Sequence, residues 1–462
     1  MKRNLPRGTA AYCCLSLGFT MLSRSFGFYY LKVFLNLYNV KENWFHLSQV
    51  LFMIWNAIND PLFALLQDNT NSFLTRTRRE GIFFTAPLFA MSYMIAWLPF
   101  GQSDWAVGIH LIAALCIYDT LYTFIGLLSC CLFTELNVCQ TDRLLLTRYS
   151  TITSLIGSQS IFLLEFSSDS LRDFTAFQAT SLGISVVASL LMMYAGLHAH
   201  TTYDIEAKVT FPAEETCKDP GTENQESFFR NTVQILREKN FIAFVVTNFF
   251  QEFHKAYLSG FTAIFCDHLI PKSQVPVSVR SIFYGLTGTL GGLAVIFGTP
   301  LIERLGYFHV IRYNFVWKFF GGLTIFFMGP SSPWLLMFFI LLDSSFAIAT
   351  FSLFNLPLAD IADHDKEKYN RRYHISSTVF ATNALIVKPS QSLAPMIVVA
   401  VLNAYGYEEL KAGSLPTYET SILKSVMFQI ISIFPILLAV VQYFSWSQFT
   451  IRHRIVEQTI DV

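Results

Sequence analysis

Long apolar stretches without a polar face are the feature that most restricts how this chain can fold. Three of them cover residues 81–98, 109–133 and 421–444. A surface helix of a soluble protein shows polar residues with a period of 3.6, and these stretches do not. Each has about 18 residues or more, enough to cross roughly 30 Å of hydrocarbon. Only 14% of the residues are charged, against about 25% in soluble domains. The sequence therefore predicts an all-α polytopic membrane protein.

Hydropathy predicts about twelve transmembrane helices in two groups of six. The first group covers residues 11–35, 44–66, 81–100, 105–133, 149–166 and 174–198, and the second covers residues 241–265, 281–302, 310–328, 334–358, 375–404 and 421–446. We expect an N-terminal six-helix bundle at residues 1–199, a cytoplasmic linker at 200–239, and a C-terminal six-helix bundle with a short cytoplasmic tail at 240–462. The polar composition of the linker and its prolines, Pro212 and Pro220, favour a soluble segment.

Lysine and arginine fall mainly on one side of the predicted spans. They gather at the start of the chain, at residues 76–79 and 143–148, in the linker, at 366–372 and in the tail. Cytoplasmic loops carry such an excess of positive charge, so both termini and the linker are expected in the cytoplasm. We expect the protein in the plasma membrane rather than in an organelle.

Composition and motifs exclude several classes of function. The net charge is zero, which gives no reason to expect nucleic acid as a partner. The eight cysteines show neither a disulfide framework nor zinc spacing. A phosphate-binding loop, a nucleophile motif and a metal-ligand cluster are also missing from the sequence. We therefore predict a protein that is not an enzyme and has no cofactor, and that acts as a monomer in the lipid bilayer on an unknown small-molecule substrate.

A weak internal repeat supports two six-span halves. Residues 59–62 near the end of the second span resemble residues 298–301 near the end of the eighth. The exit of the fourth span, 135–148, likewise resembles the exit of the tenth, 360–372. Repeats in matching positions are typical of transporter halves. Thr299 occupies the place of Asp60 in the second copy, so a cation site at this position would belong to the N-terminal half alone.

Asp60 is the acidic residue that most needs an explanation, because a carboxylate near the middle of a bilayer costs roughly 2.5–3.5 kcal/mol. Asn56 lies four residues earlier, on the same helical face. Pro61 lacks an N–H and frees the carbonyl group of Ala57. These oxygen atoms would suit Na⁺, and the carboxylate alone could carry a proton. In the alternative interpretation, Pro61 kinks the helix and Asp60 is a local cap or ion-pair partner.

Asp119 and Lys388 are two further charges inside predicted spans. Asp119 has Tyr118 and Tyr122 beside it, so it either lines a cavity or makes a structural hydrogen bond. Lys388 precedes a proline in an apolar run and would be a natural partner for Asp60 or Asp119, unless its side chain extends to the cytoplasmic surface. Exchange between such ion pairs would give an element with two states, whose balance a cation or substrate could shift.

Other charged residues are weaker candidates. Arg24 and Lys32 in the first span and His254 in the seventh could face a substrate path. Glu252 and Lys255 are spaced as i and i+3, which favours a local ion pair over such a role. Two more acidic residues are expected near the outer surface in structural roles, Glu165 and Asp343.

The motifs resemble one known family. Residues 54–62, followed by Asp68, resemble the second-span motif of the glycoside-pentoside-hexuronide:cation symporters, a branch of the major facilitator superfamily that includes the melibiose carrier. Three further passages also resemble that branch: Asp119, residues 359–363 with the arginines at 371 and 372, and Lys388. The resemblance extends over the whole chain.

The resemblance implies a major facilitator fold with alternating access. By position, Asp60, Asn56 and Asp119 are candidates for the cation site, and Lys388, Tyr122 and Arg24 for the substrate cavity and coupling. Asn56 stands where the sugar symporters carry a second carboxylate, and Ala64 replaces a glycine of the facilitator loop motif. The candidate cytoplasmic gating residues are Asp68, Glu135, Arg148, Asp360 and Arg372.

Three functions fit this sequence. The leading hypothesis is a secondary active transporter of a small organic solute, coupled to H⁺ or Na⁺. The first alternative is a facilitator-fold receptor or scaffold that does not transport, which the missing carboxylate at Asn56 favours. The second alternative is a transporter of lipids similar to lysophospholipids, which the phenylalanine-rich spans allow.

Overall fold

The computed structural model describes residues 7–68, 78–136, 140–199, 232–271, 273–330, 332–369 and 376–451. Within these ranges every regular element is helical, as the sequence predicts. In the first half of the chain the helices are α1 (Arg7–Lys32), α2 (Glu42–Asp68), α3 (Arg78–Ile95), α4 (Asp104–Leu136), α5 (Gln140–Gly157), α6 (Ser160–Ser168) and α7 (Phe174–His198). A short π-helix, η1 (Val33–Leu37), continues α1.

The second half of the chain is built in the same way. Its helices are α10 (Lys239–Leu269), α11 (Val277–Met328), α12 (Pro333–Leu353), α13 (Asn355–Lys368), α14 (Ser376–Val387), α15 (Pro389–Ala404), α16 (Tyr407–Lys411) and α17 (Thr417–Ser447). The predicted spans coincide with these helices, although the first span ends in η1, the tenth crosses from α12 into α13, and three further places depart from a regular helix.

The three departures have local causes. Gly306 has φ 74° and ψ 150° inside α11, a backbone conformation nearly confined to glycine, and it separates the eighth predicted span from the ninth. The eleventh span is divided between α14 and α15 at Pro389, which has no N–H to donate. The fifth is divided between α5 and α6 at residues 158–159.

Six helical stretches of the described chain are long and apolar enough by themselves to cross a membrane. They are Asp104–Cys130, Phe174–His198, Val277–Gly298, Pro333–Asp365, Thr382–Ala404 and Thr417–Ser447. The described parts of the other predicted spans are also helical, but they do not reach the same combination of length and apolar composition. The chain is thus an all-α polytopic membrane protein.

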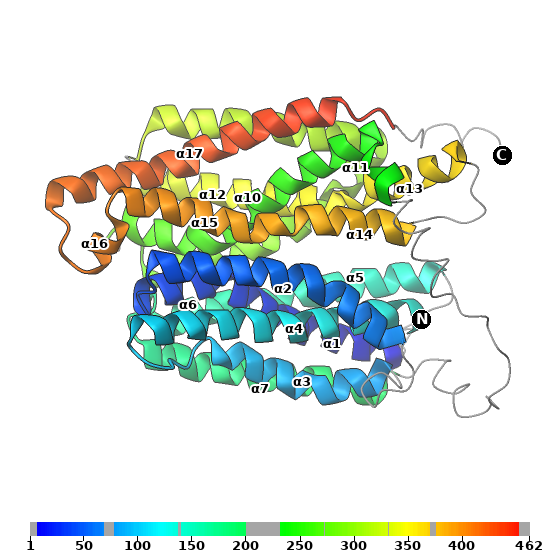
Figure 1. Cartoon of the computed structure of the whole chain (residues 1–462), viewed down its shortest axis with the longest axis horizontal. Coiled ribbons are helices and arrows are strands. Elements are labelled where there is room, and N and C mark those ends of the chain that lie inside the picture. Colours follow the sequence, from blue (N-terminus) through cyan, green and yellow to red (C-terminus); the bar gives the residue numbers. More distant parts are fainter. Residues whose placement is uncertain are drawn as a thin grey trace. The chain divides into compact units, whose positions relative to one another are not determined.

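The helices pack into two compact units. Unit 1 contains the described residues within 1–214, 263–289 and 406–415, and unit 2 those within 215–262, 290–405 and 416–462. In unit 1, α1, α2, α3, α4 and α7 run side by side along their length (Figure 1). The division into six-helix bundles with a linker at 200–239 stays a prediction, because residues 200–231 are outside the described chain.

Glycines allow close helix packing in unit 1. A Cβ atom on Gly18 of α1 would lie 2.7 Å from the carbonyl oxygen of Ala188 on α7, and one on Gly157 of α5 would lie 2.8 Å from that of Leu17 on α1. Small residues let helix backbones approach in this way inside membranes. A core of unit 2 is rich in aromatic residues instead, and the Trp446 ring lies 5.3 Å from Phe308 and 4.9 Å from Phe449 between centroids.

Candidate functional site

A buried polar pair joins α2 to α4 in unit 1. Asn59 is completely buried and Asp119 is 8% exposed. The Asn59 amide Nδ2 donates a hydrogen bond to Oδ2 of Asp119 and a longer one, 3.5 Å, to Oγ1 of Thr123. Asp119 therefore makes the hydrogen bond that its structural interpretation requires. A cation-binding role for Asp119 stays a prediction.

The other predicted cation ligands lie on the same part of α2. Asn56 is buried, one turn before Asp60. The indole N–H of the neighbouring Trp55 donates to Oγ1 of Thr120 at 3.0 Å, which fixes α2 against α4. The side chain of Asp60 lies outside the described residues, as does that of Asp68. Sequence reasoning missed Asn59 as the partner of Asp119, because it treated Asn59 only as part of a repeated motif.

Aromatic contacts join α4 to α1 on either side of Asp119 in the chain. Tyr118 stacks on Phe26 with 3.7 Å between centroids, and Tyr122 stacks on Phe19 at 4.9 Å. Tyr122 is 37% exposed, and Arg24 on α1 is exposed as well. Both predicted cavity residues of unit 1, Tyr122 and Arg24, are thus exposed.

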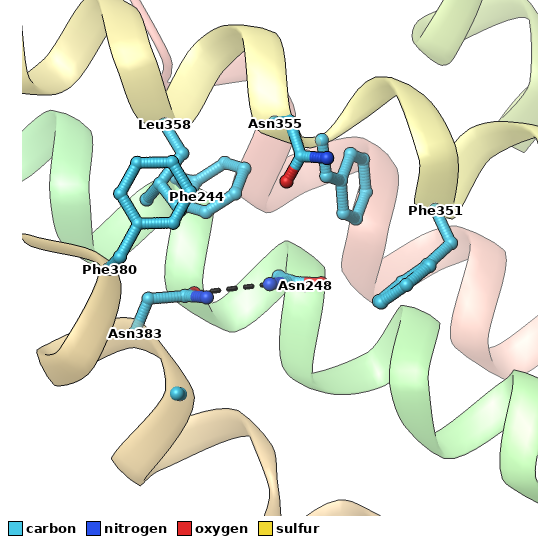
Figure 2. Close-up of a pocket in the computed structure, with 9 residues that line it drawn as sticks. Phe244, Asn248, Phe351, Asn355, Leu358, Phe380 and Asn383 are labelled. Carbon is cyan, nitrogen blue, oxygen red and sulfur yellow. Dashed lines mark hydrogen bonds between the residues drawn. The ribbon is translucent and has the colours of Figure 1, made fainter. Parts of the chain in front are cut away.

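Unit 2 contains a cavity of about 340 Å³ that the sequence did not predict. Figure 2 shows its lining, in which aromatic rings alternate with amide groups. Asn248 on α10 donates a hydrogen bond to Oδ1 of Asn383 on α14 at 3.1 Å. The nine lining residues are Phe244, Asn248, Phe351, Phe354, Asn355, Leu358, Phe380, Asn383 and Ala384. The available signal was the presence of three asparagines within or next to apolar spans.

An ion pair on α10 borders this cavity. Lys255 Nζ lies 2.7 Å from Glu252 Oε2 and 3.6 Å from the ring centroid of Phe351. Gln391 Nε2 donates to the other oxygen of Glu252 at 2.7 Å. The local i, i+3 pair predicted from the sequence is therefore confirmed. Half-buried Lys388 lies three residues before Gln391, as the residue preceding α15. Its predicted pairing with Asp60 or Asp119 stays a prediction.

The predicted gating residues are only partly described. Asp360 on α13 accepts a hydrogen bond from the Tyr307 hydroxyl, so Tyr307 is a partner that the sequence did not reveal. Arg148 is exposed on α5. The side chains of Glu135 and Arg372 lie outside the described residues. Their roles in gating stay predictions.

Lys32 belongs to a buried ion network, and its predicted place on a substrate path stays a prediction. Its Nζ atom lies 2.6 Å from Asp267 Oδ2, and Arg280 Nη1 lies 2.8 Å from Asp267 Oδ1. The Ser170 hydroxyl oxygen lies 3.0 Å from Asp267 Oδ1 and 2.7 Å from Glu165 Oε1, so its single hydrogen can be donated to either carboxylate. Glu165 is fully buried, and its predicted structural role near the outer surface stays a prediction. All five residues belong to unit 1.

The charge of Asp267 follows from this setting. Burial acts to raise its pKa, but the Lys32 ammonium, the Arg280 guanidinium and the Ser170 hydroxyl lower it further than burial raises it. The pKa of Asp267 is therefore below its ordinary value, and the carboxylate stays ionised between two cations.

Comparison with known proteins identifies the family. The model of the family described as MFS/sugar transport protein matches residues 11–446. The chain belongs to this family of the major facilitator superfamily. The resemblance to this superfamily that the second-span motif indicated is confirmed.

Two relatives match nearly the whole of this major facilitator chain. Transmembrane protein 180 of Gallus gallus is 27% identical, with 95% of this chain and 92% of the relative covered. That of Mus musculus is also 27% identical, with 96% and 92% covered. The sequence from Trp55 to Phe63 also resembles the Trp-Asn-x-x-Asn-Asp-Pro-Leu-Phe pattern of this protein.

Solved structures show the same fold at low sequence identity. The nucleoside transporter NupG superposes with a TM-score of 0.62 at 11% identity, covering 96% of this chain and 100% of that one. A bacterial homologue of the human lysosomal transporter Spinster, in an inward-facing and unoccupied conformation, gives 0.63 at 11% identity, covering 97% and 98%. The chain therefore has the fold of major facilitator transporters, as predicted.

Proposed function

We propose that this protein is a secondary active transporter that moves a small organic solute by alternating access, with H⁺ or Na⁺ as the coupling ion. The observation that carries this proposal is the buried carboxylate of Asp119, held by an amide group within a transporter fold. A carboxylate inside a bilayer is costly and usually marks an ion or substrate path. Family and fold also point to a transporter rather than an enzyme.

The cavity of unit 2 supports an uncharged or weakly polar organic solute. Its phenylalanines offer ring faces, and Asn248, Asn355 and Asn383 offer both donors and acceptors. Ligand sites commonly combine apolar walls with a few fixed polar groups. A solute with a planar or apolar body and hydroxyl or amide groups fits this lining better than a highly charged one.

For the coupling ion, we propose a site on α2 and α4 that includes Asp119, Asn56 and Asp60. Proton binding needs one carboxylate, whereas Na⁺ needs several oxygen ligands. The membrane potential supplies about 2.3 kcal/mol per charge for each 100 mV, which would drive solute accumulation. The positive-inside pattern supports a cytoplasmic location of both termini, and we propose the plasma membrane as the location.

Transport by the purified protein in proteoliposomes tests the proposal. Solute libraries are offered under an imposed pH gradient, sodium gradient or voltage. We expect one class of solute to accumulate under one gradient. Asp119→Asn and Asp60→Asn should lose gradient-driven accumulation and keep exchange of solute across the membrane.

Asp104→Asn is the matched control. It makes the same chemical change at an exposed carboxylate, which pairs with Lys41 at the start of α4, and it should transport like the parent. The proposal is wrong if no solute moves in the parent, or if all three variants accumulate solute equally well. In the first case a receptor or scaffold would become the better interpretation.

A further inference from the structure

A second cluster of ionisable groups lies inside unit 2, whereas the proposed cation site of α2 and α4 belongs to unit 1. His254 of α10, Asp343 of α12 and Lys318 of α11 are at most 3% exposed. His254 Nε2 lies 3.0 Å from Asp343 Oδ2. Three ionisable residues from three different helices thus meet in a buried interior, where charge is expensive.

The Lys318 ammonium is held by two amide oxygens. Its Nζ atom donates to Oε1 of Gln251 at 3.2 Å and to Oε1 of Gln442 at 2.9 Å. These amides are fixed in turn, because Gln251 donates to the Ala347 carbonyl at 2.8 Å and Gln442 to that of Thr247 at 3.2 Å. Both glutamines are fully buried. Lys318 therefore has a prepared site in which it can remain positively charged.

The contact with Asp343 determines which nitrogen of His254 carries hydrogen. An ionised carboxylate can only accept hydrogen bonds. Neutral His254 must therefore carry its hydrogen on Nε2, which leaves a lone pair on Nδ1. The Nδ1 atom is buried and has no hydrogen-bond partner among the described residues. This lone pair is an open position for a proton.

The charges around His254 determine what its protonation does to the cluster. The Asp343 carboxylate of α12 and the Lys318 ammonium of α11 both act on the His254 ring. Tyr257 of α10 stacks beside this ring at 6.1 Å between centroids, and α17 contributes the uncharged Gln442 to the cluster. With neutral His254, the charges of Lys318 and Asp343 cancel. One added proton gives the buried cluster a net charge of +1, which its interior accommodates poorly.

We propose that His254 is a proton-binding site of this transporter, at which a proton from water adds to Nδ1 and Asp343 stabilises the resulting imidazolium. The Nδ1–H bond forms as an O–H bond of a hydronium ion breaks, which leaves a water molecule. The added charge favours a conformation in which water reaches the cluster, so proton binding shifts the balance between conformations. The coupling to solute rests on the proposed function, whereas the protonation of His254 does not.

Nitrogen NMR of the histidine rings tests the protonation directly. The full-length protein is labelled with ¹⁵N-histidine in lipid nanodiscs and studied from pH 8 to pH 5, and the His254→Gln variant identifies the His254 signals by their absence. We expect the neutral Nε2–H form at pH 8 and imidazolium at pH 5. If His254→Gln does not fold, Asp343→Glu identifies the same signals by displacing them.

His110 is the matched control for a buried histidine. It is 1% exposed, and its Nε2 atom lies 2.7 Å from the carbonyl oxygen of Ile95 instead of a carboxylate. Without a counter-charge, His110 should stay neutral over the same pH range. Asp343→Asn should reduce the imidazolium fraction of His254 at pH 5. The inference is overturned if His254 keeps a single protonation state from pH 8 to pH 5, whether neutral or charged.

Transport assays separate this inference from the proposed function. If His254 titrates as expected and His254→Gln loses the response of uptake to a pH gradient, the site is coupled to transport. If it titrates while no solute moves in the parent protein, the proton site is correct and the proposed function fails. If uptake follows a pH gradient while His254 keeps one form, the proton is carried elsewhere and the inference fails.

Discussion

At the scale of single residues, the buried charges of the described chain discussed above have partners. How easily a partner could be predicted from the sequence depends on its distance along the chain. Glu252 and Lys255 lie one helical turn apart, and their pairing was predictable from that spacing. Lys32 and Asp267 are also paired, but they lie far apart in the chain and no local pattern connects them. The charged residues of the site were thus predictable, and most of their partners were not.

The Lys32–Asp267–Arg280 network gives a first prediction about stability. Asp267→Asn should lower the free energy of unfolding by about 3–5 kcal/mol, because it leaves two buried cations without their carboxylate. Lys32→Met should cost much less, since Asp267 keeps Arg280 and Ser170 as partners. Unfolding in detergent measures both losses, and Asp104→Asn at an exposed pair should change little. Equal losses for the two network variants would contradict this account.

The same network predicts a dependence on pH. Because the pKa of Asp267 is below its ordinary value of 3.8, the folded state binds its proton less readily than the unfolded state. Its contribution to stability is fully present above pH 3.8 and is lost as the pH falls through the lower value in the folded state. The melting temperatures of the parent and of Asp267→Asn should therefore converge in acid. A difference that stays constant from pH 7 to pH 3 would argue against an ionised Asp267.

At the scale of helices, apolar stretches predicted where the spans lie, whereas contacts between helices decide how they meet. Hydropathy separated the eighth span from the ninth, and the structure shows the physical reason in the backbone of Gly306. Hydropathy gave no sign that α1 packs closely on α7 at Gly18. The hydropathy of an apolar run that contains a glycine is the same whether the glycine contacts lipid or another helix.

Two glycines give a matched test of this packing. Gly18→Ala should destabilise the protein by about 1–3 kcal/mol, because its Cβ would lie 2.7 Å from a backbone oxygen of α7 that cannot move alone. Gly183→Ala on α7 meets nothing within 4 Å, and it should stabilise the helix by about 0.5–1 kcal/mol. Thermal unfolding of the two variants should move in opposite directions. Equal shifts would show that α1 and α7 do not pack as described.

At the scale of the whole molecule, the superfamily was predictable because its motifs are short and local, as in residues 54–62. The cavity of unit 2 was not, since its walls come from α10, α12, α13 and α14 together. Nor was the cluster at His254, which needs three helices to bring its charges together. The sequence thus predicts the superfamily better than the positions of the cavity and of the buried cluster.

The ion network also bears on how the whole molecule moves. Lys32 and Glu165 come from the predicted N-terminal bundle, whereas Asp267 and Arg280 come from the predicted C-terminal bundle. The proposed alternating access would separate these bundles on each side in turn. Under that proposal the network breaks once in each cycle, and it stabilises the conformation described here against the one in which it is broken.

Cys266 provides a natural reporter for that step, because it is 1% exposed and lies next to Asp267. Weakening the network in Lys32→Met should populate the broken state, and a shift of about 1–3 kcal/mol would raise its population roughly 5- to 150-fold. Alkylation of Cys266 by a membrane-permeant reagent, followed by mass spectrometry, should accelerate accordingly. Cys13 on α1 is also buried and should react as slowly as in the parent, because a local opening leaves it covered. Parallel acceleration at both cysteines would indicate general unfolding, and unchanged labelling of Cys266 would show that the network does not restrain the motion.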